Sequence, residues 1–348
     1  MQERPLILVT NDDGITAPGI RMLIEIMNKI GDVVVVAPDS PQSGMGHAIT
    51  VNNVLHCNPI TIDQGPQIEY SCSGTPADCV KMAKNEILNR TPDLCVSGIN
   101  HGANSSINVI YSGTMSAAVE AGIEGIPAIG FSLLDFDWHA DFRAAKKFIE
   151  KIVVNVLENG LPDGVVLNVN IPKLKEEEIK GIRVCRQANG YWKESFDKRK
   201  NPTGKEYYWL SGEFVNRDKG QDTDIWALEN NFISVVPVQF DMTAHHAIQK
   251  IKLMGHINKE VLIGVLTGLL ATACGLFVYL EFISDATIIE TLKKVKQGGV
   301  LGAVLALAAL PNLFVFWVFL KKKQDYRARG VLITTVAIAV ATLILKFV

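Results

Sequence analysis

The chain has 348 residues, a formal net charge of −2 and 48% hydrophobic residues. This length is typical of one or two domains with a sizeable core. The balanced charge argues against a nucleic-acid polymer as a partner, because proteins that bind a phosphate backbone usually carry a basic surface.

The first part of the chain alternates predicted strands and helices. Residues 6–10 form a short apolar run, and Pro18 opens a run of apolar residues at helical spacing that ends at Gly31. Four consecutive valines at residues 33–36 indicate a strand buried on both faces of a parallel sheet. Further strands are predicted at residues 94–96, 128–131 and 165–169, and further helices at residues 114–121 and 139–157. The alternation predicts an α/β fold with a doubly wound, mostly parallel sheet.

The pattern changes between residues 181 and 238, where shorter and more polar stretches contain aromatic residues. We interpret this region as a β-rich extension or hairpin used in oligomer contacts. Its tryptophans, Trp192, Trp209 and Trp226, are interpreted as packing or oligomer contacts rather than as a platform for base stacking.

The last part of the chain is far more apolar than the rest. Residues 261–280, 298–320 and 330–345 are long enough, or nearly so, to cross a hydrocarbon core of about 30 Å. The third run is the shortest and depends on Phe347 and Val348. The alternative is a soluble helical domain buried in an oligomer. We expect a catalytic domain at residues 1–250, a linker at 251–260 and about three transmembrane helices at 261–348.

Basic residues predict how the tail is oriented. Five lysines and arginines lie between residues 321 and 329, a cluster that resists translocation and should face the cytoplasm. The connection at residues 284–297 and Val348 then face outside. The start of the chain shows no secretory signal, and the six cysteines of the whole chain have no zinc-ligand spacing. A cytoplasmic catalytic domain anchored in the inner (cytoplasmic) membrane is therefore expected.

Polar clusters follow three predicted strands. Asp12 and Asp13 follow the first strand, Ser43 lies after the second, and Asn100 lies after a later one. The carboxyl ends of parallel strands meet at one edge of a sheet, where ligands usually bind. These side chains all offer oxygen ligands, which suit Mg²⁺ or Mn²⁺. Each cluster taken alone also has an ordinary role as a turn or helix cap.

Two further groups of residues have open interpretations. The segment at residues 111–114 could hold a phosphate at a helix N-terminus, or Ser112 or Thr114 could simply cap that helix. His47 and His101 could contact substrate or transfer a proton, or they could make structural hydrogen bonds.

Several motifs, in order along the chain, resemble those of the stationary-phase survival protein SurE family. They are residues 9–15 (VTNDDGI), 37–44 (APDSPQSG), 73–80 (SGTPADCV), 97–100 (SGIN), 111–114 (YSGT), 207–213 (YYWLSGE) and 233–237 (ISVVP). The resemblance covers roughly residues 5–250. It does not extend to the apolar tail, for which the family suggests no role.

The resemblance implies a metal-dependent 5′-nucleotidase that releases phosphate from nucleoside monophosphates, and in some members from 3′-nucleotides or short polyphosphate. It implies one divalent metal per subunit, bound by Asp12, Asp13, Ser43 and Asn100, with Asp12 and Asp13 as the catalytic pair. The expected substrate and phosphate contacts are Asn11, Gly44, His47, Asn104, Ser112, Gly113 and Thr114. The implied fold is a Rossmann-like domain whose extension is exchanged between subunits in a homo-dimer or tetramer.

Three alternatives remain at this point. Asp12 or Asp13 could act as a nucleophile through an aspartyl-phosphate. A dinucleotide-binding protein is disfavoured because no GxGxxG follows the first strand. A membrane-anchored regulatory or scaffold protein could carry a nucleotide-binding α/β domain, although the predicted spans lack the intramembrane charges of an ion pathway.

Overall fold

The computed structural model describes residues 4–283, 288–298 and 300–347. The chain divides into two compact units, Met1–Met242 and Thr243–Val348. Residues 284–287 of the expected external connection and Val348 lie outside the described residues.

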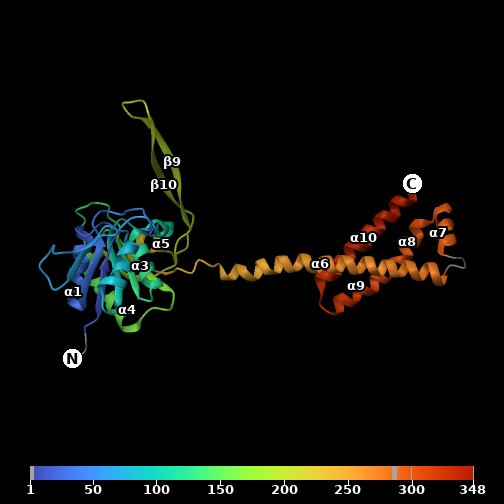
Figure 1. The fold of residues 1–348 in the computed structure, drawn as a ribbon, viewed down its shortest axis with the longest axis horizontal. Coiled ribbons are helices and arrows are strands. Elements are labelled where there is room, and N and C mark those ends of the chain that lie inside the picture. The colour runs from blue at the N-terminus through green and yellow to red at the C-terminus, as the bar shows by residue number, and fades with distance from the viewer. Residues whose placement is uncertain (1–3, 284–287, 299, 348) are drawn as a thin grey trace. The chain divides into compact units, whose positions relative to one another are not determined.

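The first unit is built around one nine-stranded sheet (Figure 1). From one edge to the other the strands are β3 (Cys57–Ile60), β4 (Ile68–Cys72), β2 (Asp32–Pro38), β1 (Leu6–Thr10), β5 (Leu94–His101), β6 (Ala128–Leu133), β7 (Val165–Ile171), β11 (Phe232–Gln239) and β8 (Gly181–Val184). The strands from β4 to β7 are parallel, whereas β3 and β11 each run antiparallel to their inner neighbour. The predicted α/β fold with a mostly parallel sheet is confirmed, with mixed edges.

Helices cover both faces of this sheet. One face packs against α1 (Pro18–Ile30) and α4 (Lys146–Asn159), and the other packs against α2 (Pro76–Met82) and α3 (Gly113–Ile123). The valines of β2 alternate between the two cores, as a strand buried on both faces requires. The short α5 (Asp224–Glu229) precedes β11.

Helix α4 begins later than predicted. The prediction started at residue 139, but the regular helix starts at Lys146. Before it, the Asp137 carboxylate accepts a hydrogen bond from the backbone N–H of His139, and the Asp141 carboxylate accepts one from that of Arg143. Such local bonds offer the backbone an alternative to the helix.

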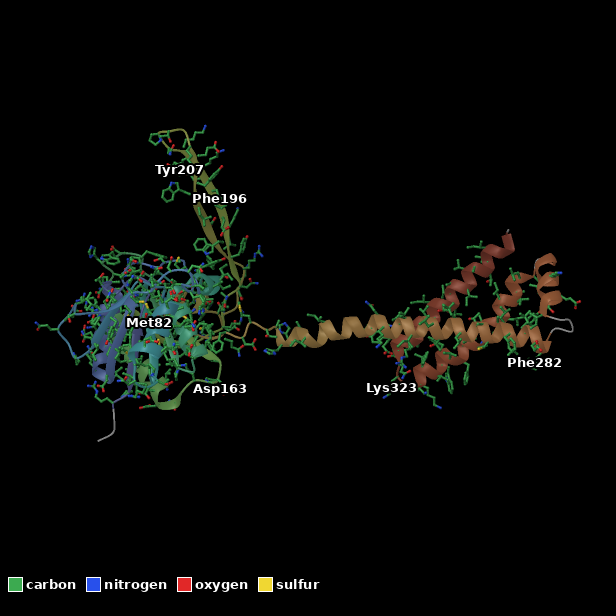
Figure 2. All side chains as sticks on the ribbon, viewed as in Figure 1. Met82, Asp163, Phe196, Tyr207, Phe282 and Lys323 are labelled. Carbon is green, nitrogen blue, oxygen red and sulfur yellow. The ribbon has the colours of Figure 1, made fainter. Side chains whose placement is uncertain are left out.

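The predicted β-rich extension is shorter than expected. Strands β8 and β11 belong to the main sheet, so the extension consists of the hairpin β9 (Gly190–Lys200) and β10 (Glu206–Asn216). The hairpin projects away from the sheet, with Phe196 and Tyr207 toward its far end (Figures 1 and 2). Both side chains are exposed.

The second unit is helical. It contains α6 (His245–Val278), α7 (Ile288–Gln297), α8 (Leu301–Ala308), α9 (Pro311–Lys321) and α10 (Asp325–Phe347). Within the described residues, three segments are long and apolar enough to cross a membrane: Ile257–Phe282, Leu301–Lys321 and Asp325–Ile344. The expected linker at residues 251–260 lies within α6, and Pro311 starts a new helix inside the expected second span.

Small residues bring α6 and α10 into close contact. A Cβ added at Gly264 would lie 2.1 Å from the Arg327 carbonyl oxygen, and one at Gly330 would lie 2.2 Å from that of Val261. The buried Asn312 amide donates to the Thr272 hydroxyl at 3.0 Å, which ties α9 to α6. Close backbone packing and polar contacts of this kind are typical of helices that associate in membranes.

Candidate active site at the carboxyl ends of the strands

Backbone hydrogen bonding joins the turn after β1 to the loop after β2. The N–H of Gln42 donates to the Asp12 carbonyl oxygen at 2.7 Å, and the N–H of Ile15 donates to that of Pro38 at 2.8 Å. Ser43, the next residue after Gln42, is exposed. The turn with the two aspartates and the loop with Ser43 therefore lie at the same edge of the sheet.

Asp12 is held from the opposite side by the start of α3. The Thr114 hydroxyl donates to Asp12 Oδ1 at 2.5 Å, and a Cβ added at Gly113 would lie only 2.6 Å from the Asp12 Cβ. Asp12 is 4% exposed. Burial, and next the charge of Asp13, raise the pKa of Asp12 from 3.8 to about 6, against the lowering effect of the Thr114 bond. A nearby cation would relieve this unfavourable accumulation of charge.

Asp13 and Asn100 are connected through β5. The backbone N–H of His101 donates to Asp13 Oδ2 at 3.2 Å, and burial raises the pKa of Asp13 despite this bond. The Asn100 Nδ2 donates to the carbonyl oxygens of Gly102 at 2.7 Å and His101 at 3.3 Å. Because both bonds use the nitrogen, the amide is oriented and its Oδ1 is left to serve as a ligand.

The two other candidate asparagines, Asn11 and Asn104, are buried and differ in their hydrogen bonding. Asn11 donates to the Gly14 carbonyl at 2.9 Å, whereas its Oδ1 has no donor among the described residues. Asn104 belongs to a polar network: its Nδ2 donates to Ser132, and its backbone N–H donates to Asn170. The amide of Asn104 is therefore engaged in shaping the loop after β5.

The remaining predicted contacts lie around the start of α3. Ser112 caps this helix, because its hydroxyl accepts the N–H of Met115 at 3.0 Å. Gly44 is exposed and has a left-handed φ of 73°. The N–H of Gly46 donates to the Tyr111 carbonyl, so the loop that carries Ser43 and Gly44 reaches this segment.

A buried glutamate, which the sequence-based analysis did not identify, anchors His47. Glu120 of α3 is 3% exposed and accepts hydrogen bonds from His47 Nε2 at 2.7 Å and Lys81 Nζ at 2.5 Å. Burial alone would raise the pKa of Glu120, but the bonds to His47 and Lys81 outweigh burial and lower it. The sequence does hold one sign of this role, because Glu120 is the acidic residue among the small and apolar residues of α3.

His101 is surrounded by a loop that the prediction also missed. Its Nδ1 lies 2.8 Å from the Asp137 carbonyl oxygen, and its ring stacks on Trp138 with 5.7 Å between ring centres. A Cβ added at Gly102 would lie 2.2 Å from the Phe136 ring. The His101 side chain thus packs against this loop, while its backbone N–H donates a hydrogen bond to Asp13.

The donor chemistry fits a hard divalent cation. Asp12, Asp13, Ser43 and Asn100 offer carboxylate, hydroxyl and amide oxygens, the ligands preferred by Mg²⁺ and Mn²⁺. In the described part of the chain, no three His, Cys, Asp or Glu side chains are grouped so as to hold a metal ion. The proposed ligand set contains only two carboxylates, with two neutral oxygens, and so does not require such a group of three. The unpaired Oδ1 of Asn11, the residue before Asp12, could accept a hydrogen bond from a bound water.

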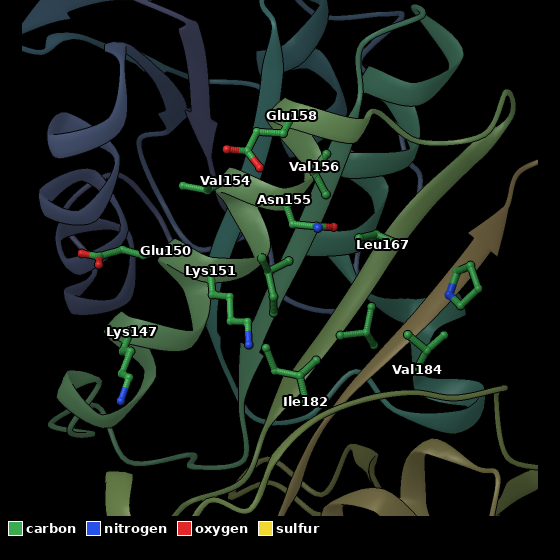
Figure 3. A pocket seen from close by; sticks show the side chains of 13 residues that line it. Lys147, Glu150, Lys151, Val154, Asn155, Val156, Glu158, Leu167, Ile182 and Val184 are labelled. Carbon is green, nitrogen blue, oxygen red and sulfur yellow. The ribbon is translucent and has the colours of Figure 1, made fainter.

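A separate pocket of about 760 Å³ lies between α4 and strands β7, β8 and β11 (Figure 3). Leu167, Ile182 and Val184 form part of its apolar wall, while Lys147 and Glu158 contribute charges. It includes none of the candidate site residues. We therefore place the chemistry at the strand ends and not in this pocket.

Comparison with known proteins identifies the family. The family model "Survival protein SurE" matches residues 7–194. A "5′-nucleotidase SurE" of Flavobacterium psychrophilum is 74% identical over 246 residues, which are 71% of this chain and 96% of that protein. A "5′-nucleotidase SurE" of Bacteroides fragilis is 47% identical over 251 residues, covering 72% of this chain and 97% of that protein. The crystal structure of the SurE protein from Aquifex aeolicus superimposes with a TM-score of 0.63 and 41% identity, covering 72% of this chain and all of that one. The chain belongs to the SurE family.

Proposed function

We propose that this protein is a phosphoric monoester hydrolase, a metal-dependent 5′-nucleotidase that converts nucleoside 5′-monophosphates to nucleosides and phosphate. The observation that carries the proposal is the buried Asp12 carboxylate beside Asp13, at the strand edge that also carries Ser43 and Asn100. The relatives named 5′-nucleotidase SurE supply the reaction class.

The side chains have separate roles in this proposal. Asp12, Asp13, Ser43 and Asn100 would hold one Mg²⁺ or Mn²⁺ per subunit, which would neutralise phosphate charge and lower the pKa of bound water. Thr114 fixes the orientation of the Asp12 carboxylate through its 2.5 Å bond.

Phosphate binding falls to the segment opposite Asp12. The backbone at Gly113 lies at the N-terminus of α3, where free N–H groups attract anions, and Gly44 offers a second open stretch of backbone. The free Oδ1 of Asn11 is an acceptor and so would hold a bound water rather than a phosphate oxygen, while Ser112 and Asn104 maintain the shapes of their loops.

Phosphate release from a panel of nucleotides tests the function. The full chain, purified in detergent, is treated with a chelator and then assayed with 5′- and 3′-nucleotides and short polyphosphate, with and without Mg²⁺ or Mn²⁺. We expect metal-dependent release from 5′-monophosphates. Nucleotide binding without release under every metal condition would instead support a regulatory or scaffold protein. Trapping of a phosphoenzyme would assign an aspartate as the nucleophile.

The proposed organisation is a catalytic domain at residues 1–250, joined through residues 251–260 to a membrane region at residues 261–348. The catalytic domain faces the cytoplasm. Three tail segments have suitable length and apolar character, and the basic cluster at residues 321–329 favours the cytoplasmic side. We expect the chain in the membrane fraction after cell fractionation. We also expect a Lys323→Cys variant to react with a cysteine label only after the cells are permeabilised. Labelling from outside intact cells would refute this orientation.

The hairpin β9–β10 is the proposed oligomer contact, in a dimer or tetramer. Within the part of the chain that the structure describes, its strands pair only with each other, and Phe196, Trp209 and Leu210 are exposed along it. A lone two-stranded hairpin is marginally stable in water, so a second subunit that covers these apolar side chains would stabilise it. Light scattering of Phe196→Ser and Trp209→Ser variants in detergent should show a smaller assembly.

A further inference from the structure

A second pocket lies at the root of the hairpin, next to the phosphate-binding segment. Its volume is about 310 Å³, and it is lined by Tyr111, Trp192, Glu194, Leu210, Ser211 and Gly212. This volume lies at the lower end of the range for small-molecule sites. The pocket thus combines aromatic, aliphatic and carboxylate surfaces in a space suited to one planar ring.

The pocket is within reach of a phosphate bound beside Asp12. Tyr111 is two residues before Gly113, where an added Cβ would lie 2.6 Å from the Asp12 Cβ, and two residues of chain span at most about 7 Å. A molecule with its phosphate at the start of α3 therefore needs only a short spacer, such as a ribose, to place a ring against Tyr111.

Both aromatic rings are available, and the Trp192 ring is held in position. Tyr111 is 55% exposed and Trp192 is 41% exposed. Trp192 Nε1 donates to Asn108 Oδ1 at 2.7 Å, and the Trp192 ring packs edge-on against Phe214 at 5.8 Å. Because Trp192 is anchored to both the hairpin and the segment before Tyr111, its ring direction is set before a ligand arrives.

We propose that this pocket binds the nucleobase of the substrate, with Tyr111 and Trp192 as stacking surfaces and the Glu194 carboxylate as an acceptor for base N–H groups. The assignment rests on the proposed phosphohydrolase function. It makes Tyr111 and Trp192 specificity-determining residues that favour nucleotides over sugar phosphates and polyphosphate, which lack a ring. It also revises the interpretation of Trp192 as a purely structural contact.

A competing aromatic surface lies near His101. Phe136 and Trp138 are exposed, but Trp138 already stacks on His101 and so has one face occupied. The pocket at Tyr111 is lined by residues of β9, β10 and the segment before α3, and it adjoins the phosphate-binding segment. These differences favour the Tyr111 pocket as the base site. The test below includes the loop at residues 136–138 as the alternative site.

The test compares adenosine 5′-monophosphate with ribose 5-phosphate, which has the same phosphate ester but no base. The measured quantity is the ratio of kcat/KM for the two substrates, determined with the full chain in detergent. We expect Tyr111→Ala to lower this ratio about tenfold or more, the effect of losing one aromatic–base stack. Tyr111→Phe keeps the ring and should retain the wild-type ratio. Tyr208→Ala is the matched control, an exposed aromatic on the same hairpin outside the pocket.

Calorimetric binding of the same two ligands to the same variants separates the two proposals. Base-dependent binding lost in Tyr111→Ala, without any hydrolysis, would uphold the base site and refute the hydrolase. Hydrolysis of both substrates with a ratio that Tyr111→Ala does not change would refute the base site alone. A ratio lowered by Trp138→Ala but not by Tyr111→Ala would also overturn it, since the base would then lie near His101.

Discussion

Gly113 lies against Asp12 so closely that a Cβ added to the glycine would sit 2.6 Å from the Asp12 Cβ. Non-bonded carbon atoms do not approach to that distance, so any side chain at residue 113 must displace the aspartate or the start of α3. The glycine therefore sets the position of a candidate metal ligand without taking part in chemistry itself.

Gly113→Ala should lower phosphate release about 100-fold, because displacement of a site group by about 1 Å can cost this much. Overpacking should also reduce the free energy of unfolding by about 1–3 kcal/mol. Steady-state kinetics and thermal unfolding measure the two effects. Val119→Ala, on the same helix, is the control and should retain activity. Unchanged kinetics in Gly113→Ala would show that the position of Asp12 is not critical.

Asp12→Asn should stabilise the metal-free protein at pH 8 and abolish phosphate release. The folded-state pKa of Asp12 is raised to about 6 from 3.8, so between these values the folded state binds more protons than the unfolded state. Stability contributed by protonated Asp12 is therefore present below about pH 4 and lost as pH rises through 6. The gain at pH 8 should be on the order of 3 kcal/mol.

Thermal unfolding in the presence of a chelator, at pH 4.5 and pH 8, tests this expectation. The advantage of Asp12→Asn should shrink at the lower pH, where the wild-type carboxyl becomes largely protonated. An equal advantage at both values would mean that the charge of Asp12 is not the cause. Added Mg²⁺ or Mn²⁺ should raise the melting temperature of the wild type but not of the variant.

Glu120→Ala should loosen the loop at residues 39–56. The Glu120 carboxylate accepts bonds from both His47 and Lys81, and its loss leaves the Lys81 ammonium without this partner and removes the anchor of His47. Truncation of one partner in such a buried network costs about 1–3 kcal/mol. Limited proteolysis followed by mass spectrometry should show faster cleavage within residues 39–56. Glu86→Ala, at the carboxyl-terminal side of Lys81, should leave the cleavage pattern unchanged.

Gly264→Leu and Gly330→Leu should each disrupt the packing of α6 against α10. At both positions an added Cβ would lie within 2.2 Å of a carbonyl oxygen on the partner helix, so the helices must separate. We expect a lower melting temperature in detergent and faster protease cleavage in the tail. Leu270→Ala changes an exposed side chain of α6 and should melt like the wild type. Melting of Gly264→Leu at the wild-type temperature would contradict the close packing.

Local patterns in the sequence determined the main elements of the fold. The valines at residues 33–36 predict a strand buried on both faces, because their side chains alternate between two cores, and Pro18 and Gly31 mark the ends of α1. The clusters at Asp12 and Asn100 follow from the rule that parallel strands bring their carboxyl ends together. These features depend on neighbouring residues or on a general rule of topology.

Only the tertiary structure decided features that depend on contacts between distant residues. Strand β11 joins the main sheet by pairing with β7, and β8 joins it by pairing with β11, whereas within the described residues β9 and β10 pair only with each other. Glu120 anchors His47 across 73 positions of sequence, and Gly113 meets Asp12 across about 100. Long-range pairing leaves no periodic trace near either partner, because its energy comes from surfaces that meet only after the chain has folded.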